Sequence, residues 1–156
     1  MSLEEVRAKN IQLVSEKALD CFTKNGIANT KVADIAKAAG LTERSVYRYF
    51  EAKSDIVIAA AFCYWNRTKE HISRELSMHD YRDLSGIEQI SIILNSYANI
   101  LFIDPEGIRF SLDAEIALYS AGKNERVINR PPERFEEHSG PLSVAIEKGL
   151  KDGTVD

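Results

Sequence analysis

The sequence has few of the residues and segments that mark secreted or membrane-spanning proteins. No run of about 18 uncharged apolar residues occurs, so no membrane-spanning helix is predicted. The opening stretch MSLEEVRAKN is charged and mixed, which excludes a secretion signal there. The two cysteines, Cys21 and Cys63, lie on apolar faces of predicted helices and are expected to be buried free thiols. We therefore predict a cytoplasmic protein with no membrane partner.

Catalytic signatures are also scarce. The three histidines, His71, His79 and His138, are scattered, and none belongs to a two-histidine metal motif on a helix. The sequence contains no glycine-rich phosphate loop and no nucleophile elbow. We therefore predict that the chain is not an enzyme, holds no metal and needs no cofactor.

Apolar residues recur at helical spacing along most of the chain, and no stretch alternates with period two. The fold class is therefore predicted to be all-α. Helices are expected over 3–25, from Thr30 to Gly40, from Thr42 to Phe50 and from about Lys53 into the middle seventies. Further helices should follow Ser85 or Asp83, follow the Asp104-Pro105 break, and carry the last apolar residues after a break at 130–132. The helix after Ser85 is apolar on more than one side and should be central to its domain.

The stretch from Thr30 to Phe50 reads as a helix, a turn and a second helix. Thr30 is predicted to cap the first helix, and Gly40 to end it in the left-handed conformation. Thr42 is predicted to cap the second helix, whose buried side carries Val46 and Phe50. Such a pair of helices is either an ordinary helical corner or a helix-turn-helix that reads DNA, and spacing alone favours neither.

The other side of the second helix carries Glu43, Arg44, Tyr47 and Arg48. Arginines supply forked donors for guanine edges and phosphates, and tyrosines supply flat apolar surface for thymine methyl groups. The charge distribution is compatible with this role, because residues 1–50 hold eight Lys/Arg against six Asp/Glu, whereas residues 51–156 hold twelve against eighteen. A mildly basic head on an acidic body suits DNA binding.

The same stretch resembles the tetracycline-repressor-like (TetR) family of bacterial transcription regulators. The matching positions are Thr30, Ile35-Ala36, Ala39-Gly40-Leu41-Thr42, Tyr47, Phe50 and Lys53, followed at once by a long helix. The resemblance implies a DNA-binding domain over 1–52 and a helical regulatory domain for ligand binding and dimerisation over 53–156. Relatives continue for two further helices, so we expect this chain to lack the last helices of that second domain.

The resemblance also implies which residues meet DNA. Base edges would be approached by Glu43, Arg44, Tyr47 and Arg48, and phosphates would be met by Thr30, Lys31, Thr42, Ser45, Tyr47, Tyr49 and Lys53. Arg44 departs from the pattern, because many relatives have a small residue there, and this departure suggests a distinct operator. The partner would be a palindromic operator in double-stranded DNA, bound by a homodimer.

A ligand-responsive repressor is the function that the resemblance implies, with an unknown small molecule as effector. Relatives bind their ligands among the helices of the body, and the aromatic and polar candidates here are Phe62, Cys63, Trp65, Tyr97, Phe102, Phe110, Glu115 and Tyr119. Ordinary core packing is the competing interpretation for each of them. The alternative function is a DNA-binding regulator or architectural protein that is controlled by a protein partner and has no small-molecule ligand.

Overall fold

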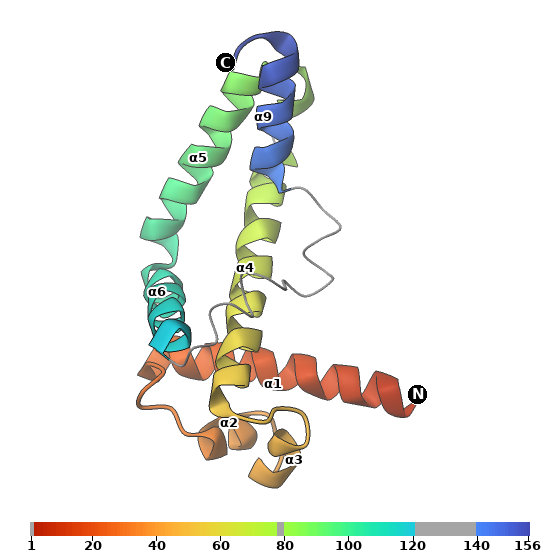
Figure 1. Cartoon of the computed structure of the whole chain (residues 1–156), viewed down its shortest axis with the longest axis vertical. Helices are drawn as coiled ribbons and strands as arrows, with labels where there is room; N and C mark the ends of the chain where they lie inside the picture. The colour runs from red at the N-terminus through yellow and green to blue at the C-terminus, as the bar shows by residue number, and fades with distance from the viewer. Residues whose placement is uncertain (1, 78–79, 121–139) are drawn as a thin grey trace. The chain divides into compact units, whose positions relative to one another are not determined.

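The computed structural model describes residues 2–77, 80–120 and 140–156 (Figure 1). Within these ranges the chain forms seven α-helices and one short 3-10 helix, with no strand, so the all-α prediction is confirmed. The elements are α1 (Leu3–Asn25), α2 (Val32–Ala38), α3 (Glu43–Tyr47), α4 (Lys53–Ser77), η1 (Tyr81–Asp83), α5 (Gly86–Ile103), α6 (Pro105–Ser120) and α9 (Pro141–Asp152). The break predicted at 130–132 lies outside the described residues.

The described residues divide into two compact units. Among the described residues, unit 1 combines 2–65 with 106–120, and unit 2 combines 66–77 and 80–105 with 140–156. The boundary within α4 falls later than the predicted division after residue 52, because the first three turns of α4 share a core with α1. The division into a DNA-binding and a regulatory domain remains a prediction.

The longest helix of unit 1, α1, has the predicted bounds. Ser2 and Glu5 begin it as a reciprocal cap, because the Glu5 N–H donates to Ser2 Oγ (3.1 Å) and the Ser2 N–H donates to the Glu5 carboxylate (2.6 Å). Gly26, at a φ of +82°, ends the helix in a conformation that favours glycine. Cys21, which was expected to be buried, is a half-buried thiol whose pKa is raised, mainly by desolvation.

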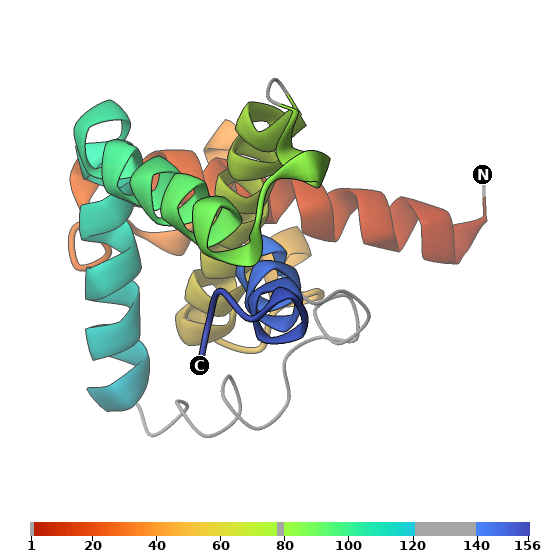
Figure 2. The same cartoon turned by 90° about the horizontal axis from the view of Figure 1, so that it is seen from above.

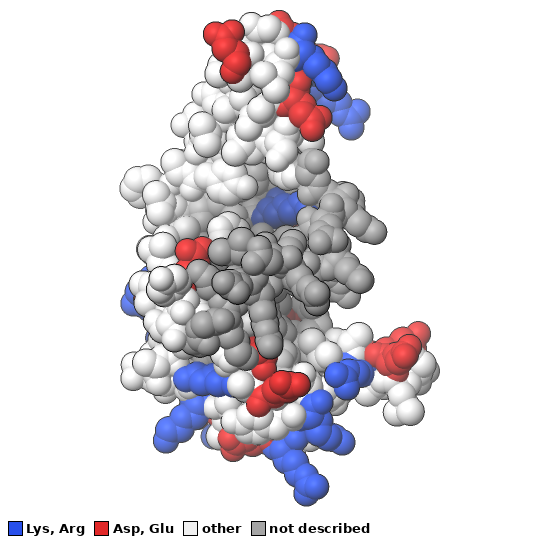
Figure 3. Space-filling view, viewed as in Figure 1, with Lys and Arg blue, Asp and Glu red and all other residues white. Residues whose placement is uncertain are grey.

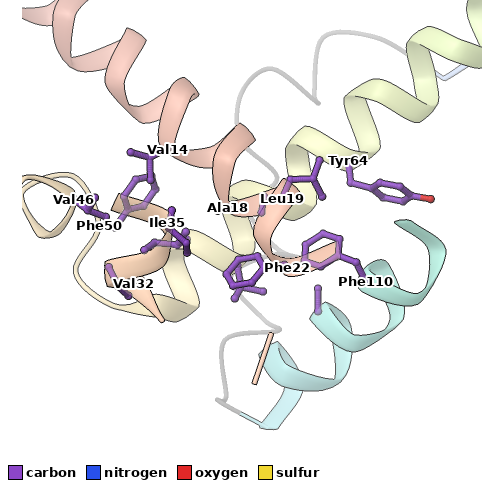
Figure 4. Packing of buried hydrophobic residues seen from close by; sticks show 14 of the residues in the cluster. Val14, Ala18, Leu19, Phe22, Val32, Ile35, Val46, Phe50, Tyr64 and Phe110 are labelled. Atoms are coloured by element: carbon purple, nitrogen blue, oxygen red, sulfur yellow. The ribbon is translucent and has the colours of Figure 1, made fainter. Parts of the chain in front are cut away.

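The core of unit 1 is built from α1, α2, α3, the first half of α4, and α6. On α1, α2, α4 and α6 its buried residues form stripes with steps of three or four residues, as the apolar periodicity predicts, and α3 contributes Val46. Figure 4 shows the side chains turned toward one another; the labelled ones are Val14, Ala18, Leu19, Phe22, Val32, Ile35, Val46, Phe50, Tyr64 and Phe110. This shared core holds α2 and α3 in place.

Unit 2 contains the close packing of α5 on α9, which lie side by side in Figures 1 and 2. The contact depends on two buried glycines: a Cβ on Gly86 would lie 2.1 Å from the Gly149 backbone nitrogen. The end of the chain also caps α5, since the Gly86 N–H donates to Asp152 Oδ2 (2.8 Å) and the Ile87 N–H to Thr154 Oγ1 (3.2 Å). The predicted cap Ser85 is confirmed, and its N–H donates to the Glu88 carboxylate (2.8 Å).

The prediction that α5 is central is wrong for the described structure. Its buried stripe includes Ile93 and Ile100, but Leu94, Leu101 and Phe102 are exposed. When a helix is apolar on all sides, its sequence does not indicate which side packs against another helix. The helix α5 is 18 residues long and has a mean hydropathy of 1.2, so by length and composition alone it is sufficient to cross a membrane. A core helix of a soluble protein meets the same criterion.

Candidate nucleic-acid interface

The turn between α2 and α3 follows the predicted chemistry. Gly40 has a φ of +67°, and the Leu41 N–H reaches back to the Ala36 carbonyl oxygen (2.9 Å), which satisfies the end of α2. Thr42 then begins α3, because its hydroxyl accepts the Ser45 N–H (3.2 Å). The Gly40 turn and the Thr42 cap are both confirmed, and they set the direction in which the short α3 runs.

The two sides of α3 differ as predicted. Val46 is fully buried and Phe50, just beyond the helix, is 6% exposed, so both belong to the core of unit 1. Arg44, Tyr47 and Arg48 lie on the exposed side, together with Glu43. A large, half-exposed tyrosine ring between two exposed arginines forms a surface with both forked donors and flat apolar area.

A hydrogen-bonded chain of side chains runs along α3. The hydroxyl groups of Thr42 and Ser45 lie 2.9 Å apart, and Arg48 Nη2 donates to Ser45 Oγ at 3.3 Å. This contact uses one of the five guanidinium N–H donors of Arg48, and the others remain for a ligand. Ser45 therefore restricts the arginine to one side of the helix before anything binds.

Basic side chains are exposed around both helices of this motif. They are Lys31 and Lys37 of the α2 region and Arg44 and Arg48 of the α3 region, against the exposed carboxylates of Asp34, Glu43 and Glu51. In Figure 3, lysine and arginine side chains gather over the part of unit 1 that carries α2 and α3. The surface thus has the positive side chains that a polyanion requires, and the acidic ones moderate their charge.

Thr30 occupies a different position from the predicted one. Lys31 is the N-cap of α2, and its N–H is paired with the Asp34 carboxylate (2.9 Å). The Thr30 side chain is 1% exposed, and its hydroxyl donates to the carbonyl oxygens of Gly26 (2.8 Å) and Cys21 (3.3 Å). Thr30 therefore joins the end of α1 to the start of α2, and we remove its side chain from the predicted phosphate contacts. The capping prediction for Thr30 is wrong.

Two other predicted phosphate contacts are held by hydrogen bonds from distant parts of unit 1. Lys53 Nζ donates to the Ile27 carbonyl oxygen in the turn between α1 and α2. The Tyr49 hydroxyl oxygen accepts a hydrogen bond from Asn10 Nδ2 of α1 (2.9 Å). Both side chains are half-buried, so their positions are fixed by their neighbours. Asn10 was not predicted from the sequence, because nothing in its local pattern indicates a partner 39 residues away.

The predicted ligand-pocket residues do not form one described site. Phe110 is 2% exposed and packs in the core of unit 1, so its side chain is already surrounded by protein. Phe62 and Cys63 are half-buried, while Glu115 is exposed. Among the pocket candidates, four aromatic side chains are exposed by more than a third: Trp65, Tyr97, Phe102 and Tyr119. Tyr97 and Phe102 belong to unit 2 and the other six candidates to unit 1, so the pocket remains a prediction.

A surface hollow of about 500 Å³ lies on the second half of α4. Polar side chains line it, and none of them is a predicted pocket residue: Asn66, Lys69, Glu70, Ser73 and Arg74. Among the residues that the structure describes, no group of three or more His, Cys, Asp and Glu could hold a metal ion. The helix-turn-helix surface is therefore the best-defined candidate site of the described chain.

Comparison with known proteins points to the same part of the chain. Residues 15–60 match the family model described as bacterial regulatory proteins, tetR family. Two regulators of Pseudomonas putida, the probable HTH-type transcriptional regulator ArpR and the HTH-type transcriptional regulator TtgR, are each 34% identical over 83 residues. That match covers 53% of this chain and 39% of each relative.

A third relative, the HTH-type transcriptional regulator AcrR of Shigella flexneri, is 40% identical over 45 residues, which is 29% of this chain and 21% of the relative. The matched stretch of the family includes the end of α1, both helices of the helix-turn-helix and the start of α4. These are the elements whose caps, turn and buried residues are described above. The N-terminal region of this chain is therefore similar to that of the tetR family of bacterial regulatory proteins.

Proposed function

We propose that this protein is a sequence-specific DNA-binding regulator of transcription that places α3 in the major groove. One observation carries the proposal: α3 buries Val46 in the core of unit 1 and turns Arg44, Tyr47 and Arg48 outward. A helix fixed on one side and furnished with arginine and tyrosine on the other suits base readout. Three relatives carry the name of HTH-type transcriptional regulators, which supports the same proposal.

The exposed side chains divide into two roles. Base edges are read by Arg44 and Arg48, with Tyr47 against a thymine methyl group and Glu43 accepting from a cytosine amino group. Phosphates are bound by residues in and around α2, α3 and the start of α4: Lys31, Thr42, Ser45, Tyr49 and Lys53. Phosphate contacts set the register of α3, and base contacts set the sequence preference.

The regulator acts as a cytoplasmic homodimer on a palindromic operator, because two α3 helices related by two-fold symmetry read two equal half-sites. A small effector bound in the helical body releases it from DNA. Such an effector must bind the DNA-incompatible state more tightly than the DNA-bound state, since equal affinity for both shifts nothing. These features rest on family likeness, and the matched stretch is only 39% of the length of ArpR and TtgR.

Selection of bound sequences from random DNA tests this function directly. The chain is incubated with a randomised duplex pool, and the Arg48→Ala variant is carried through in parallel. We expect the wild-type chain to enrich a palindromic site. We expect the variant to enrich the same site with a weaker base preference at one position of each half-site. If the folded wild-type protein enriched no sequence, that result would contradict the proposal. Melting shifts against a ligand library then separate an effector-controlled regulator from one controlled by a protein partner.

A further inference from the structure

The amino-terminal half of α1 contacts the turn that follows α3. Asn10 Nδ2 donates a hydrogen bond to the Tyr49 hydroxyl oxygen at 2.9 Å. One helical turn earlier, the guanidinium carbon of Arg7 lies 6.0 Å from the centre of the Tyr49 ring. Two side chains of α1 thus meet the same tyrosine, which has been placed among the phosphate contacts.

The direction of the hydrogen bond determines what the tyrosine can still do. A phenol has one O–H donor and lone pairs that accept. Because the Asn10 amide N–H already supplies a hydrogen to the Tyr49 oxygen, the phenolic proton is left to donate to another acceptor. Tyr49 is half-buried, so its neighbours hold the ring, and with it the hydroxyl group, in place.

The charge beside Tyr49 favours an anionic acceptor. Arg7 is exposed, and its position over the ring is stabilised by the attraction between a cation and the negative face of the ring. Hydrogen bonds from a neutral donor to an ionised oxygen are stronger than those between neutral groups. On the same helix, the carboxylate of Glu5 is engaged with the Ser2 N–H at the start of α1. A phosphate oxygen fits both the free phenolic proton and the guanidinium.

We propose that Arg7, Asn10 and Tyr49 form a phosphate-binding site that extends the DNA-binding surface from α3 onto α1. The phenolic O–H of Tyr49 donates a hydrogen bond to a phosphate oxygen of the DNA backbone, and Arg7 supplies the neighbouring positive charge. Asn10 is a positioning residue, because it acts through the tyrosine. The inference rests on the proposed DNA-binding function and assigns to it two residues of α1.

The competing role for these contacts is purely structural: Asn10 and Arg7 could fix α1 to the turn after α3 without touching DNA. The two roles differ in what the loss of a single hydroxyl does. Tyr49→Phe keeps the ring and its contact with Arg7 and removes only the O–H. If the hydroxyl meets phosphate, the affinity for DNA should fall by about tenfold, the size expected for one hydrogen bond to a charged acceptor.

A double-mutant cycle on Asn10 and Tyr49 tests the coupling. Asn10→Ala alone should weaken DNA binding. In the double variant it should add little to the loss of affinity caused by Tyr49→Phe, because the Asn10 amide acts only through the hydroxyl that Tyr49→Phe removes. Additive losses would overturn the positioning role. Operator affinity is measured by fluorescence anisotropy, and the melting temperature of each variant is recorded to separate binding from folding.

Asn10→Asp provides a variant that keeps the structural contact. A carboxylate accepts from the phenol, so the link between α1 and Tyr49 survives, but the phenolic proton is now consumed. The expected result is weakened DNA binding with a melting temperature near the wild-type value. Ala8→Asp is the matched control, since it adds the same charge at an exposed position on the other side of α1. Equal loss of affinity in both variants would show a charge effect alone and contradict the assignment.

Arg7 is tested by the salt dependence of binding. Arg7→Gln should reduce the slope of log affinity against log salt by about one, because each phosphate contact releases about one counterion. Lys9→Gln removes the same charge from an exposed position on the other side of the helix and should change the slope less. Equal slopes for the two variants would remove Arg7 from the site.

The wild-type chain separates failure of this inference from failure of the proposed function. If it binds its selected operator and the four site variants lose only stability, the α1 site is overturned while DNA binding by α3 stands. If the folded wild-type chain binds no selected sequence, both proposals fall together.

Discussion

The ring of Phe22 in α1 stacks on the ring of Phe110 in α6, with centroids 5.8 Å apart and the planes within 8° of parallel. Tyr64 of α4 meets Phe110 edge-on at 6.3 Å, and Arg109 Nη2 donates to the Thr23 carbonyl oxygen at 3.1 Å. α6 is therefore fixed to α1 and α4 by apolar and polar contacts (Figure 4). The helix-turn-helix and α6 share one core, although some 60 residues of sequence separate them.

Phe110→Ala should lower the free energy of unfolding by about 3–5 kcal/mol, because it removes a buried aromatic ring and leaves a cavity between α1, α4 and α6. Phe102→Ala is the matched control, since that ring is 85% exposed. Urea denaturation followed by circular dichroism measures both. Similar, small effects of the two substitutions would contradict the core assignment of Phe110 and return it to the pocket candidates.

Local patterns in the sequence predicted much of the fold. The bounds of α1, the Gly40 turn, the Thr42 cap and the Ser85 cap are confirmed. Each depends on backbone groups within a few residues, where side-chain chemistry leaves few choices. The outward face of α3 was predicted for the same reason, because burial of Val46 four residues before Phe50 fixes the helix rotation.

Contacts between residues far apart in sequence were not predictable in this way. The hydrogen bonds of Lys53 with Ile27 and of Gly86 with Asp152 join residues 26 and 66 positions apart. A single sequence contains no signal for such pairs, since each side chain has many possible partners. Thr30 illustrates the error that follows: a threonine before a helix is a good cap by type, yet its hydroxyl bonds back to the end of α1.

Gly86→Ala should destabilise unit 2. The added methyl group would lie 2.1 Å from the Gly149 nitrogen and 2.2 Å from its Cα, and both are backbone atoms that cannot rotate away. α5 and α9 must separate, at an expected cost of about 1–3 kcal/mol. Gly140→Ala is the control, because nothing lies within 4 Å of a Cβ there. Hydrogen exchange of the α5 and α9 amides measures the local effect, and equal protection in the two variants would exclude the proposed clash.

The caps at the start of α5 should make unit 2 sensitive to acid. Hydrogen bonds from Ser85 hold the pKa of Glu88 below its ordinary 4.5, and bonds from Thr154 and Gly86 hold that of Asp152 below 3.8. A pKa lowered by folding contributes stability above the unfolded pKa, and that stability is lost as the pH falls through the folded value. The melting temperature should therefore drop as the pH falls below about 4.5.

Glu88→Gln and Asp152→Asn should each flatten this acid dependence, since an amide does not titrate. Glu147→Gln is the control for loss of one exposed negative charge from the same unit. Thermal unfolding is followed at a series of pH values from about 6 to about 3, a range that spans the ordinary pKa values of both carboxyl groups. An acid response as steep in the two cap variants as in the wild type would show that the caps do not cause it.

Arg48 and Lys53 should affect DNA binding in different ways. Arg48 lies on the exposed side of the α3 region with most of its donors available, so Arg48→Ala should cost about 1–3 kcal/mol at one operator position. Lys53 meets phosphate in the proposal, so Lys53→Ala should weaken binding to all operators equally and reduce the salt slope by about one. Affinities for operator variants at several salt concentrations distinguish the two.

The hydrogen bond from Lys53 to Ile27 adds a structural consequence to this comparison. Lys53→Ala removes a link between the first turn of α4 and the turn that precedes α2, so its melting temperature should fall, whereas that of Arg48→Ala should not. Binding is therefore compared at a temperature where both variants are folded. If both substitutions then weaken every operator alike, Arg48 contacts the backbone instead of a base. Readout would pass to Arg44, one turn earlier in α3, and to Tyr47, the exposed residue directly before Arg48.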